Sequence, residues 1–262
     1  MRRSWLPHLF IGLMIALMSA PLIVTVGVSL NEKRALFFPP RGISLAWYGQ
    51  LFMDPTWLSA LATSFSVSLL AALLAVAIAL PVAYFLWRHN LVYARYLFVI
   101  GLMPFALPPV ITAIGALSFW AQIGWSGRLE NLVIGHAILM VSLPLVMISL
   151  GLRGIGREVL EAAQVMGANE RVAFRTVVLP LIRSYIFSSF AFVFILSMNE
   201  YVLSFFLGQF KTITLPVKIV TQLRSGYSPI IAVSAVFFMM LGIAVFSLIA
   251  RFGNLPKLLG AR

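Results

Sequence analysis

Long apolar runs alternate with short polar segments along this chain. The apolar runs cover approximately residues 9–30, 61–87, 97–121, 132–152, 184–207 and 229–250. Each run is long enough to cross a hydrocarbon core of about 30 Å as a helix that rises about 1.5 Å per residue. The pattern therefore predicts an all-α membrane protein with about six transmembrane helices.

The first apolar run shares some features with a secretory signal peptide. It is longer than the apolar part of such a peptide, usually about 7–15 residues, and no small-residue cleavage site follows it. We therefore expect a retained first span, followed by a polar connection from Asn31 to about Ala60. Within this connection, Ser44 is expected to cap a short helix. Asp54-Pro55 predicts the start of another, because proline suits the first helical position.

Prolines interrupt the third apolar run, at Pro104, Pro108 and Pro109. An interior proline removes a backbone hydrogen bond and costs about 3 kcal/mol in an ordinary helix. A membrane tolerates such a loss only where neighbouring groups or water satisfy the freed carbonyls. The sequence thus predicts a kink or a break in this span. Glycines at Gly101, Gly115 and Gly151 are expected to allow close packing of helices.

One polar and charged segment, residues 157–180, separates the fourth and fifth apolar runs. Apolar residues recur there at a spacing of three, at Leu160, Ala163 and Met166. This spacing predicts a helix over residues 157–166, and Gly167 is expected to end it because glycine adopts a positive φ without a steric penalty. Asn169 can cap a second short helix, which Pro180 is expected to end. The segment is predicted to form a helix-turn-helix knob.

The composition agrees with a membrane location. Of the 262 residues, 61% are hydrophobic and 10% are charged, against about 25% charged in soluble domains. The chain has no cysteine, which excludes disulfides and cysteine-ligated metal sites. A net charge of +12 would suggest nucleic acid on a soluble protein. In a membrane protein the charge is assigned by side of the membrane, so we expect no nucleic-acid partner.

Lysine and arginine are divided unevenly between the two sides of the predicted membrane. Of the 19 such residues, seven lie on one side, namely Lys33, Arg34, Arg41, Arg128, Lys211, Lys218 and Arg224. The other twelve lie on the side of both termini and of residues 157–180. Cytoplasmic loops carry the excess of positive charge. We therefore expect both termini and the knob to be cytoplasmic.

Residues 157–180 also resemble a known motif. Glu161-Ala162-Ala163, Gly167 and Leu179-Pro180 stand at the spacing of the EAA loop of bacterial ABC importer permeases, with Val177 where that family most often has isoleucine. On this motif, the chain resembles a binding-protein-dependent ABC importer permease of the MetI-like type. The resemblance implies that the knob sits in a groove of a cytoplasmic ATPase and passes its movement to the spans. The alternative for this segment is an amphipathic helix on the membrane surface.

The same resemblance implies a set of partners and a location. It implies a non-catalytic, multi-pass subunit of a bacterial inner (plasma) membrane. It also implies a second permease subunit, expected to be a different chain, two ATP-binding subunits and a periplasmic substrate-binding protein. ATP and Mg would be used by the partner ATPase. We expect no cofactor on this chain, which lacks a Gly-x-x-x-x-Gly-Lys-Ser/Thr phosphate loop.

The expected organisation has three parts. Residues 1–56 would form the first span and an external loop. Residues 57–250 would form the importer transmembrane domain, with the coupling loop at residues 157–180. Residues 251–262 would form a cytoplasmic tail.

One acid, Glu200, lies within an apolar run. A buried carboxylate costs several kcal/mol unless it is paired, hydrated or neutral. Glu200 follows Arg183 by 17 residues, or about 25 Å of helix. That distance places it in the outer half of the membrane, at a level that His136 of the fourth span is expected to share.

Two interpretations of Glu200 remain open. One is an outward-facing cavity that attracts a cationic group and is lined by Asn199, Glu200, Tyr201 and His136. The other is a structural carboxylate that is wetted by the interface, or paired with Arg128 or with a partner subunit. A lone histidine such as His136 is more often a packing residue than a ligand.

The segment from Thr214 to Ile219 is similar to the one after the fifth span in polyamine-type importer permeases. In those relatives an acidic pair often stands where Asn199-Glu200 stands here. The resemblance implies a polyamine or another amine-bearing compound as the solute. The single acid leaves room for a singly charged amine or a zwitterion.

Two other classes of function would also use Glu200 and His136. An ion- or proton-coupled secondary transporter would use them as a relay, but it predicts inverted repeats, and the sequence has no clear internal repeat. A membrane-embedded enzyme needs at least two catalytic groups at one depth, and these two residues are the only candidate pair. The secondary transporter would leave the 157–180 knob without a role.

Overall fold

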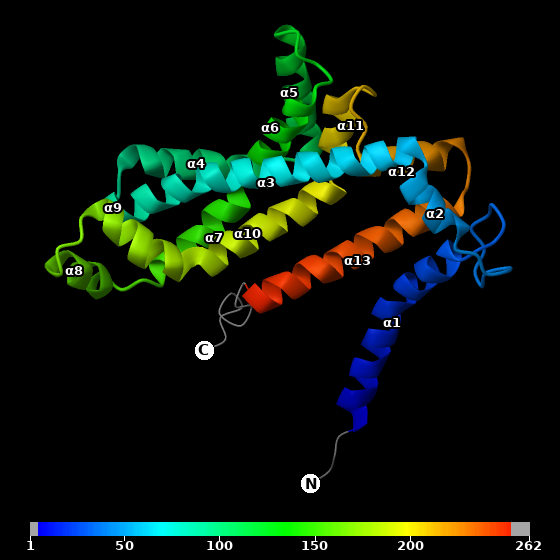
Figure 1. The fold of residues 1–262 in the computed structure, drawn as a ribbon, viewed down its shortest axis with the longest axis horizontal. Helices are drawn as coiled ribbons and strands as arrows, with labels where there is room; N and C mark the ends of the chain where they lie inside the picture. Colours follow the sequence, from blue (N-terminus) through cyan, green and yellow to red (C-terminus); the bar gives the residue numbers. More distant parts are fainter. Residues whose placement is uncertain (1–4, 253–262) are drawn as a thin grey trace. The chain divides into compact units, whose positions relative to one another are not determined.

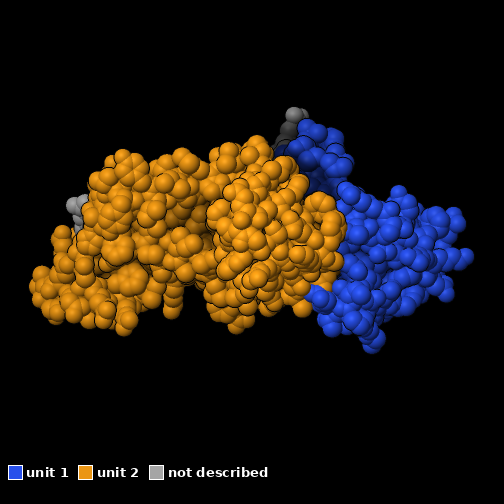
Figure 2. All heavy atoms as spheres, turned by 90° about the horizontal axis from the view of Figure 1, so that it is seen from above, with its two compact units in different colours: residues 1–59, 218–241 blue, residues 60–217, 242–262 orange. Residues whose placement is uncertain are grey.

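The computed structural model describes residues 5–252, so most of the tail expected at residues 251–262 lies outside the described residues. Over the described range the chain is helical and has no strand, with one isolated bridge between Asn31 and Ile43. Two compact units form. One comprises residues 1–59 and 218–241, and the other comprises residues 60–217 and 242–262 (Figure 2).

Four helical runs are long and apolar enough to cross a membrane alone. They are α1 (Trp5–Ser29), α3 (Pro55–His89), the continuous run Glu170–Asn199 and α13 (Pro229–Phe252) (Figure 1). Two bent pairs would each make one further span. The pairs are α4 (Val92–Ala106) with α5 (Pro109–Gln122), and α6 (Leu129–Met140) with α7 (Ser142–Arg153). If each pair is counted once, the predicted all-α fold with about six spans is confirmed.

The prolines of the third apolar run break it, as predicted. The axes of α4 and α5 differ by 111° (Figure 1). Leu107 and Pro108 between them are extended, because a residue that precedes proline avoids the helical region. Pro109 then starts α5, where its missing N–H costs nothing. Pro104 lies inside α4.

Helices α7 and α10 (Leu179–Asn199) pack against each other in the larger unit. Gly151 permits this contact, since a Cβ there would lie 2.7 Å from the ring of Tyr185. A Cβ at Gly101 would likewise clash with Leu145. Gly115 differs, because a Cβ there would meet nothing within 4 Å. Close packing therefore explains two of the three glycines singled out from the sequence.

Both helices predicted to start between Asn31 and Ala60 form, but Ser44 is not the cap of the first. The N-cap of α2 (Ala46–Met53) is Leu45, and Ser44 Oγ, one residue earlier, accepts the N–H of Ala46 at 3.2 Å. Asp54 Oδ1 accepts the N–H and the hydroxyl of Thr56 at the start of α3, both at 2.8 Å. The hydroxyl and then the amide of Thr56 lower the pKa of the Asp54 carboxyl.

The prediction that Pro180 ends a helix is wrong. Helix α9 (Glu170–Ala173) continues through one π-helical turn, η1 (Phe174–Val178), into α10, and Pro180 lies in the first turn of α10. In η1 the N–H of Leu179 donates to the carbonyl of Phe174, five residues back. An α-turn would place the proline ring against the carbonyl four residues earlier. The wider π-turn relieves this clash, so the helix continues.

Two features of the C-terminal third also differ from expectation. The fifth apolar run is not one helix, because α10 ends at Asn199 and α11 (Val202–Gly208) begins two residues after Glu200. The segment between the fifth and sixth apolar runs, for which no helix was predicted, contains α12 (Leu215–Ser225). Pro216 in its first turn was an available sequence signal for that helix start.

Replacing Gly151 by alanine should destabilise the α7–α10 contact. The added methyl group would press on the ring of Tyr185, and overpacking of this kind costs about 1–3 kcal/mol. We expect a lower midpoint of thermal unfolding for the detergent-solubilised protein. Gly115→Ala is the matched control, since it adds the same group to a helix where space is open. Equal midpoints for the two variants would contradict the packing role of Gly151.

Candidate functional site

Helix α8 (Arg157–Val165) carries the Glu161-Ala162-Ala163 triplet. Leu160 and Ala163 are buried, whereas Glu161 and Ala162 are exposed. The helix therefore packs one side against the protein and presents Glu161 on another. The tip beyond it is apolar and open, because Val165 and Met166 are 88% and 82% exposed.

The turn between the two knob helices forms as the sequence predicted. Gly167 has a φ of +87°. The N–H of Gly167 donates to Gln164 O at 2.9 Å, and the N–H of Ala168 donates to Ala163 O at 3.0 Å. This pair of bonds is the Schellman termination, which satisfies the last carbonyls of a helix. Asn169 Oδ1 accepts the N–H of Val172 at 3.0 Å, so Asn169 caps α9.

The second knob helix is attached to the end of α3. Glu170 Oε1 lies 3.4 Å from Arg88 Nε and 3.1 Å from His89 Nε2. The ring of Tyr84, one turn before Arg88, and the ring of Phe174, one turn after Glu170, meet edge to face with centroids 4.7 Å apart. Exposed ion pairs contribute only about 0–1 kcal/mol each, so the aromatic contact adds substantially to this attachment.

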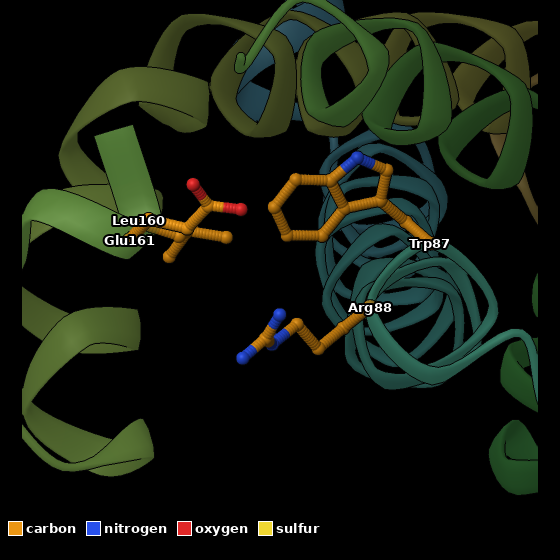
Figure 3. Close-up of a pocket in the computed structure, with 4 residues that line it drawn as sticks. All are labelled: Trp87, Arg88, Leu160 and Glu161. Atoms are coloured by element: carbon orange, nitrogen blue, oxygen red, sulfur yellow. The ribbon is translucent and has the colours of Figure 1, made fainter. Parts of the chain in front are cut away.

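A hollow separates the first knob helix from the end of α3. It has a volume of about 250 Å³ and is lined by Trp87, Arg88, Leu160 and Glu161. Figure 3 shows Glu161 and Leu160 on one side, facing Trp87 and Arg88 on the other. The first acid of the motif thus lines a hollow that also holds a base and an indole ring.

The remaining motif residues lie on other elements of the same segment. Leu179 and Pro180 form the first turn of α10. Leu179 is half-buried and Pro180 is exposed. The motif thus extends from the exposed helix α8 to the start of a span, through Gly167 and the cap at Asn169.

The second predicted group centres on Glu200, which lies at the break between α10 and α11. Its Oε1 accepts the N–H of Leu203 at 3.0 Å, and its Oε2 accepts the N–H of Ser204 at 3.1 Å. The first amides of a helix have no partner within that helix, so the carboxylate caps α11. The Glu200 side chain is 10% exposed.

His136 joins this cap from α6. It is fully buried, and its Nε2 lies 3.7 Å from Glu200 Oε2. Its Nδ1 is 2.7 Å from Ser197 Oγ, and its Nε2 is 3.1 Å from Ser204 Oγ. The structure thus places His136 and Glu200 at one level and adds two serines that the sequence analysis missed. The sequence held a signal for these serines, because Ser197 and Ser204 stand three residues before and four residues after Glu200 in one apolar run.

The structure does not bring the other predicted pathway residues into this group. Asn199 is exposed, and its Nδ2 donates to Ile195 O at 2.8 Å. Tyr201 is half-buried, and its ring centroid lies 5.6 Å from that of Phe205. Arg128 lies over the ring of Trp125 at 5.2 Å. The contacts of the Glu200 carboxylate are therefore to the start of α11 and to His136.

Comparison with known proteins places most of the chain in one family. Residues 75–254 match the model of the binding-protein-dependent transport system inner membrane component. The spermidine/putrescine transport system permease protein PotC of Haemophilus influenzae is 26% identical, over 94% of this chain and 95% of that relative. The putrescine transport system permease protein PotI of Escherichia coli is 29% identical, over 80% of this chain and 77% of that relative.

Solved structures share the fold. A bacterial ABC transporter involved in the import of the acidic polysaccharide alginate superposes with a TM-score of 0.66 at 15% identity, over 97% of this chain and 96% of that chain. An amino acid ABC transporter superposes with a TM-score of 0.61 at 18% identity, over 81% of this chain and 99% of that one. The match over residues 75–254, together with the spans that these structures share, identifies the chain as a member of the binding-protein-dependent transport system inner membrane component family, a permease subunit of a MetI-like ABC importer.

Proposed function

We propose that this chain forms half of the translocation pathway of an ATP-driven importer for an amine-bearing solute. We further propose that residues 157–180 couple the chain to the partner ATPase. The observation that carries the proposal is the knob itself. It presents Glu161 and an apolar tip outward, and Glu170 ties its second helix to α3. An exposed apolar tip beside charged side chains is typical of a surface that a protein partner covers.

The continuous run from Glu170 to Asn199 supports mechanical coupling. Because α9, η1 and α10 form one helical rod, a displacement of the knob moves the far end of the rod as well. That far end adjoins the Glu200 break. Helix α10 packs on α7, so the same displacement is passed to a second span.

The partners follow from this arrangement. The chain would work with a second permease subunit, which we propose is a different chain, two ATP-binding subunits and a periplasmic binding protein. ATP and Mg would be used in the partner ATPase. The excess of lysine and arginine on the side of the knob supports a cytoplasmic knob and cytoplasmic termini.

The solute would pass Glu200 and His136, with Asn199 and Tyr201 next to Glu200 along the chain. A carboxylate offers about four lone-pair positions, and capping uses two of those on Glu200. The acid therefore keeps acceptor capacity for the N–H groups of an amine. The names of the PotC and PotI relatives support a polyamine or another amine. The family match favours an ATP-driven importer over a secondary transporter that uses Glu200 and His136.

An ATP-binding chain should co-purify with the tagged protein from its native membrane. Glu161→Lys should reduce the amount retained by about tenfold, because a reversed charge at the centre of an interface costs more than about 1 kcal/mol. Quantitative mass spectrometry of the purified complex measures this ratio. Glu130→Lys is the matched control, an exposed acid in the first turn of α6. A single purified chain that transports solute without an ATPase would overturn the proposal.

Gly167→Val should uncouple ATP hydrolysis from transport. Space is not limiting, because a Cβ at Gly167 meets nothing within 4 Å. The positive φ costs an ordinary residue about 1–2 kcal/mol, whereas asparagine tolerates it. In proteoliposomes, Gly167→Val should import less solute per ATP hydrolysed and Gly167→Asn should stay close to wild type. Equal ratios for the two variants would show that the turn geometry does not matter for coupling.

Glu200→Gln should weaken uptake of an amine while the protein stays folded. The glutamine oxygen can still accept one of the two capping N–H groups, but its NH₂ group cannot accept the other, and the negative charge is lost. We expect KM to rise about tenfold, the loss of about 1.4 kcal/mol, and the thermal midpoint to fall because one capping bond is lost. Glu130→Gln, which removes an exposed acid, serves as the control. Unchanged uptake kinetics would leave Glu200 with a purely structural role.

A further inference from the structure

A second cavity lies at the same end of α3 as the knob. Its volume is about 380 Å³, and residues of α3, α4 and α7 line it. Trp87 and Asn90 come from the end of α3 and the turn after it, Arg95 and Phe98 from α4, and Ser149 and Arg153 from α7. Trp87 also lines the hollow that faces Glu161, so the two spaces share a wall.

Every polar side chain that lines this cavity can donate a hydrogen bond, and none is a carboxylate. Arg95 Nη2 donates to Asn90 Oδ1 at 2.8 Å, which occupies the amide oxygen and leaves its NH₂ group as a donor. Within residues 5–252, the basic side chains found within 4.0 Å of a carboxylate are Arg88, His89 and His136, so Arg95 and Arg153 have no acidic partner. Two unpaired guanidinium groups around one cavity favour an anion, and their fork matches a phosphate oxygen pair.

Local structure brings these side chains together. Arg95 and Phe98 are three residues apart on α4, and Ser149 and Arg153 are four apart on α7, so each pair lies on one helix face. Helices α4 and α7 pack against each other. Asn90 has a φ of +49°, a conformation that asparagine adopts more readily than most residues, and it turns the chain from α3 into α4 beside the cavity.

The position of the cavity points to a lipid. It lies where three candidate spans end, namely α3 at His89, α4 at Val92 and α7 at Arg153. Ends of spans lie at the surface of the bilayer, where basic pockets between transmembrane helices bind anionic headgroups. Ala83, Leu86 and Phe98 add an apolar wall. A charged rim with an apolar wall suits a molecule that has both a phosphate and acyl chains.

We propose that this cavity binds the phosphate diester of an anionic phospholipid. Its assignment to the cytoplasmic leaflet rests on the orientation proposed above, whereas the binding itself does not. Bound there, the phosphate would bridge α4 and α7. It would also stabilise the position of Trp87, which lines the hollow that faces the knob. Free phosphate shares the headgroup chemistry but gains nothing from the apolar wall.

The test measures lipid retention by the complete transporter. The complex is reconstituted in nanodiscs of phosphatidylcholine with a minor fraction of phosphatidylglycerol, and native mass spectrometry then counts the phosphatidylglycerol that stays bound. Arg95→Gln and Arg153→Gln should each lower retention about fivefold. Arg183→Gln is the matched control, because Arg183 is an exposed arginine near the same end of the chain's spans but outside the cavity. It should leave retention unchanged.

Two outcomes would overturn the proposal. Equal losses in Arg183→Gln and in the two cavity variants would mean that general surface charge retains the lipid. Displacement of phosphatidylglycerol by inorganic phosphate would assign the site to a soluble anion. A thermal midpoint measured in phosphatidylcholine alone shows that each variant is folded. Because the readout is lipid and not uptake, it stays valid even if the importer proposal fails.

Discussion

Every backbone amide and carbonyl in the hydrocarbon layer needs a partner inside the protein, and this constraint shapes the whole chain. Where the helices stay continuous, the requirement is met automatically. Where a span breaks, another group of the protein must bond the freed backbone amides and carbonyls. At the α10–α11 break, the Glu200 carboxylate accepts the N–H groups of Leu203 and Ser204. His136 lies beside that carboxylate, and the hydroxyls of Ser197 and Ser204 hydrogen-bond to its ring.

The same atoms therefore serve local structure and the proposed substrate pathway. A carboxylate that caps a helix is held in one orientation, with its remaining lone pairs directed away from the cap. A fixed carboxylate recognises a cation better than a mobile one, because less conformational entropy is lost on binding. Stability and recognition are thus compatible at Glu200, and the two interpretations of this residue are not exclusive.

Features encoded by one or two neighbouring residues were predictable from the sequence. The α4–α5 break followed from its prolines, and the knob turn followed from Gly167 and Asn169. Features that depend on distant contacts were not predictable. No glycine or proline marks the break at Glu200, whose histidine partner stands 64 positions earlier in the chain. The continuation of the helix past Pro180 depends on a π-turn that no single residue type announces. The lining of the Arg95–Arg153 cavity likewise required the packing of α4 on α7.

The π-turn η1 has a consequence for the geometry of the knob. Each residue of an α-helix advances the azimuth by about 100°, and a π-turn accommodates one residue more than an α-turn. Phe174–Val178 therefore sets the rotational phase between α9 at one end of the rod and Asn199 at the other. Deleting one residue here would rotate α9 relative to α10 by roughly a quarter of a circle. Relatives with a different rotation between these two helices would present the knob to their ATPase subunits from another direction.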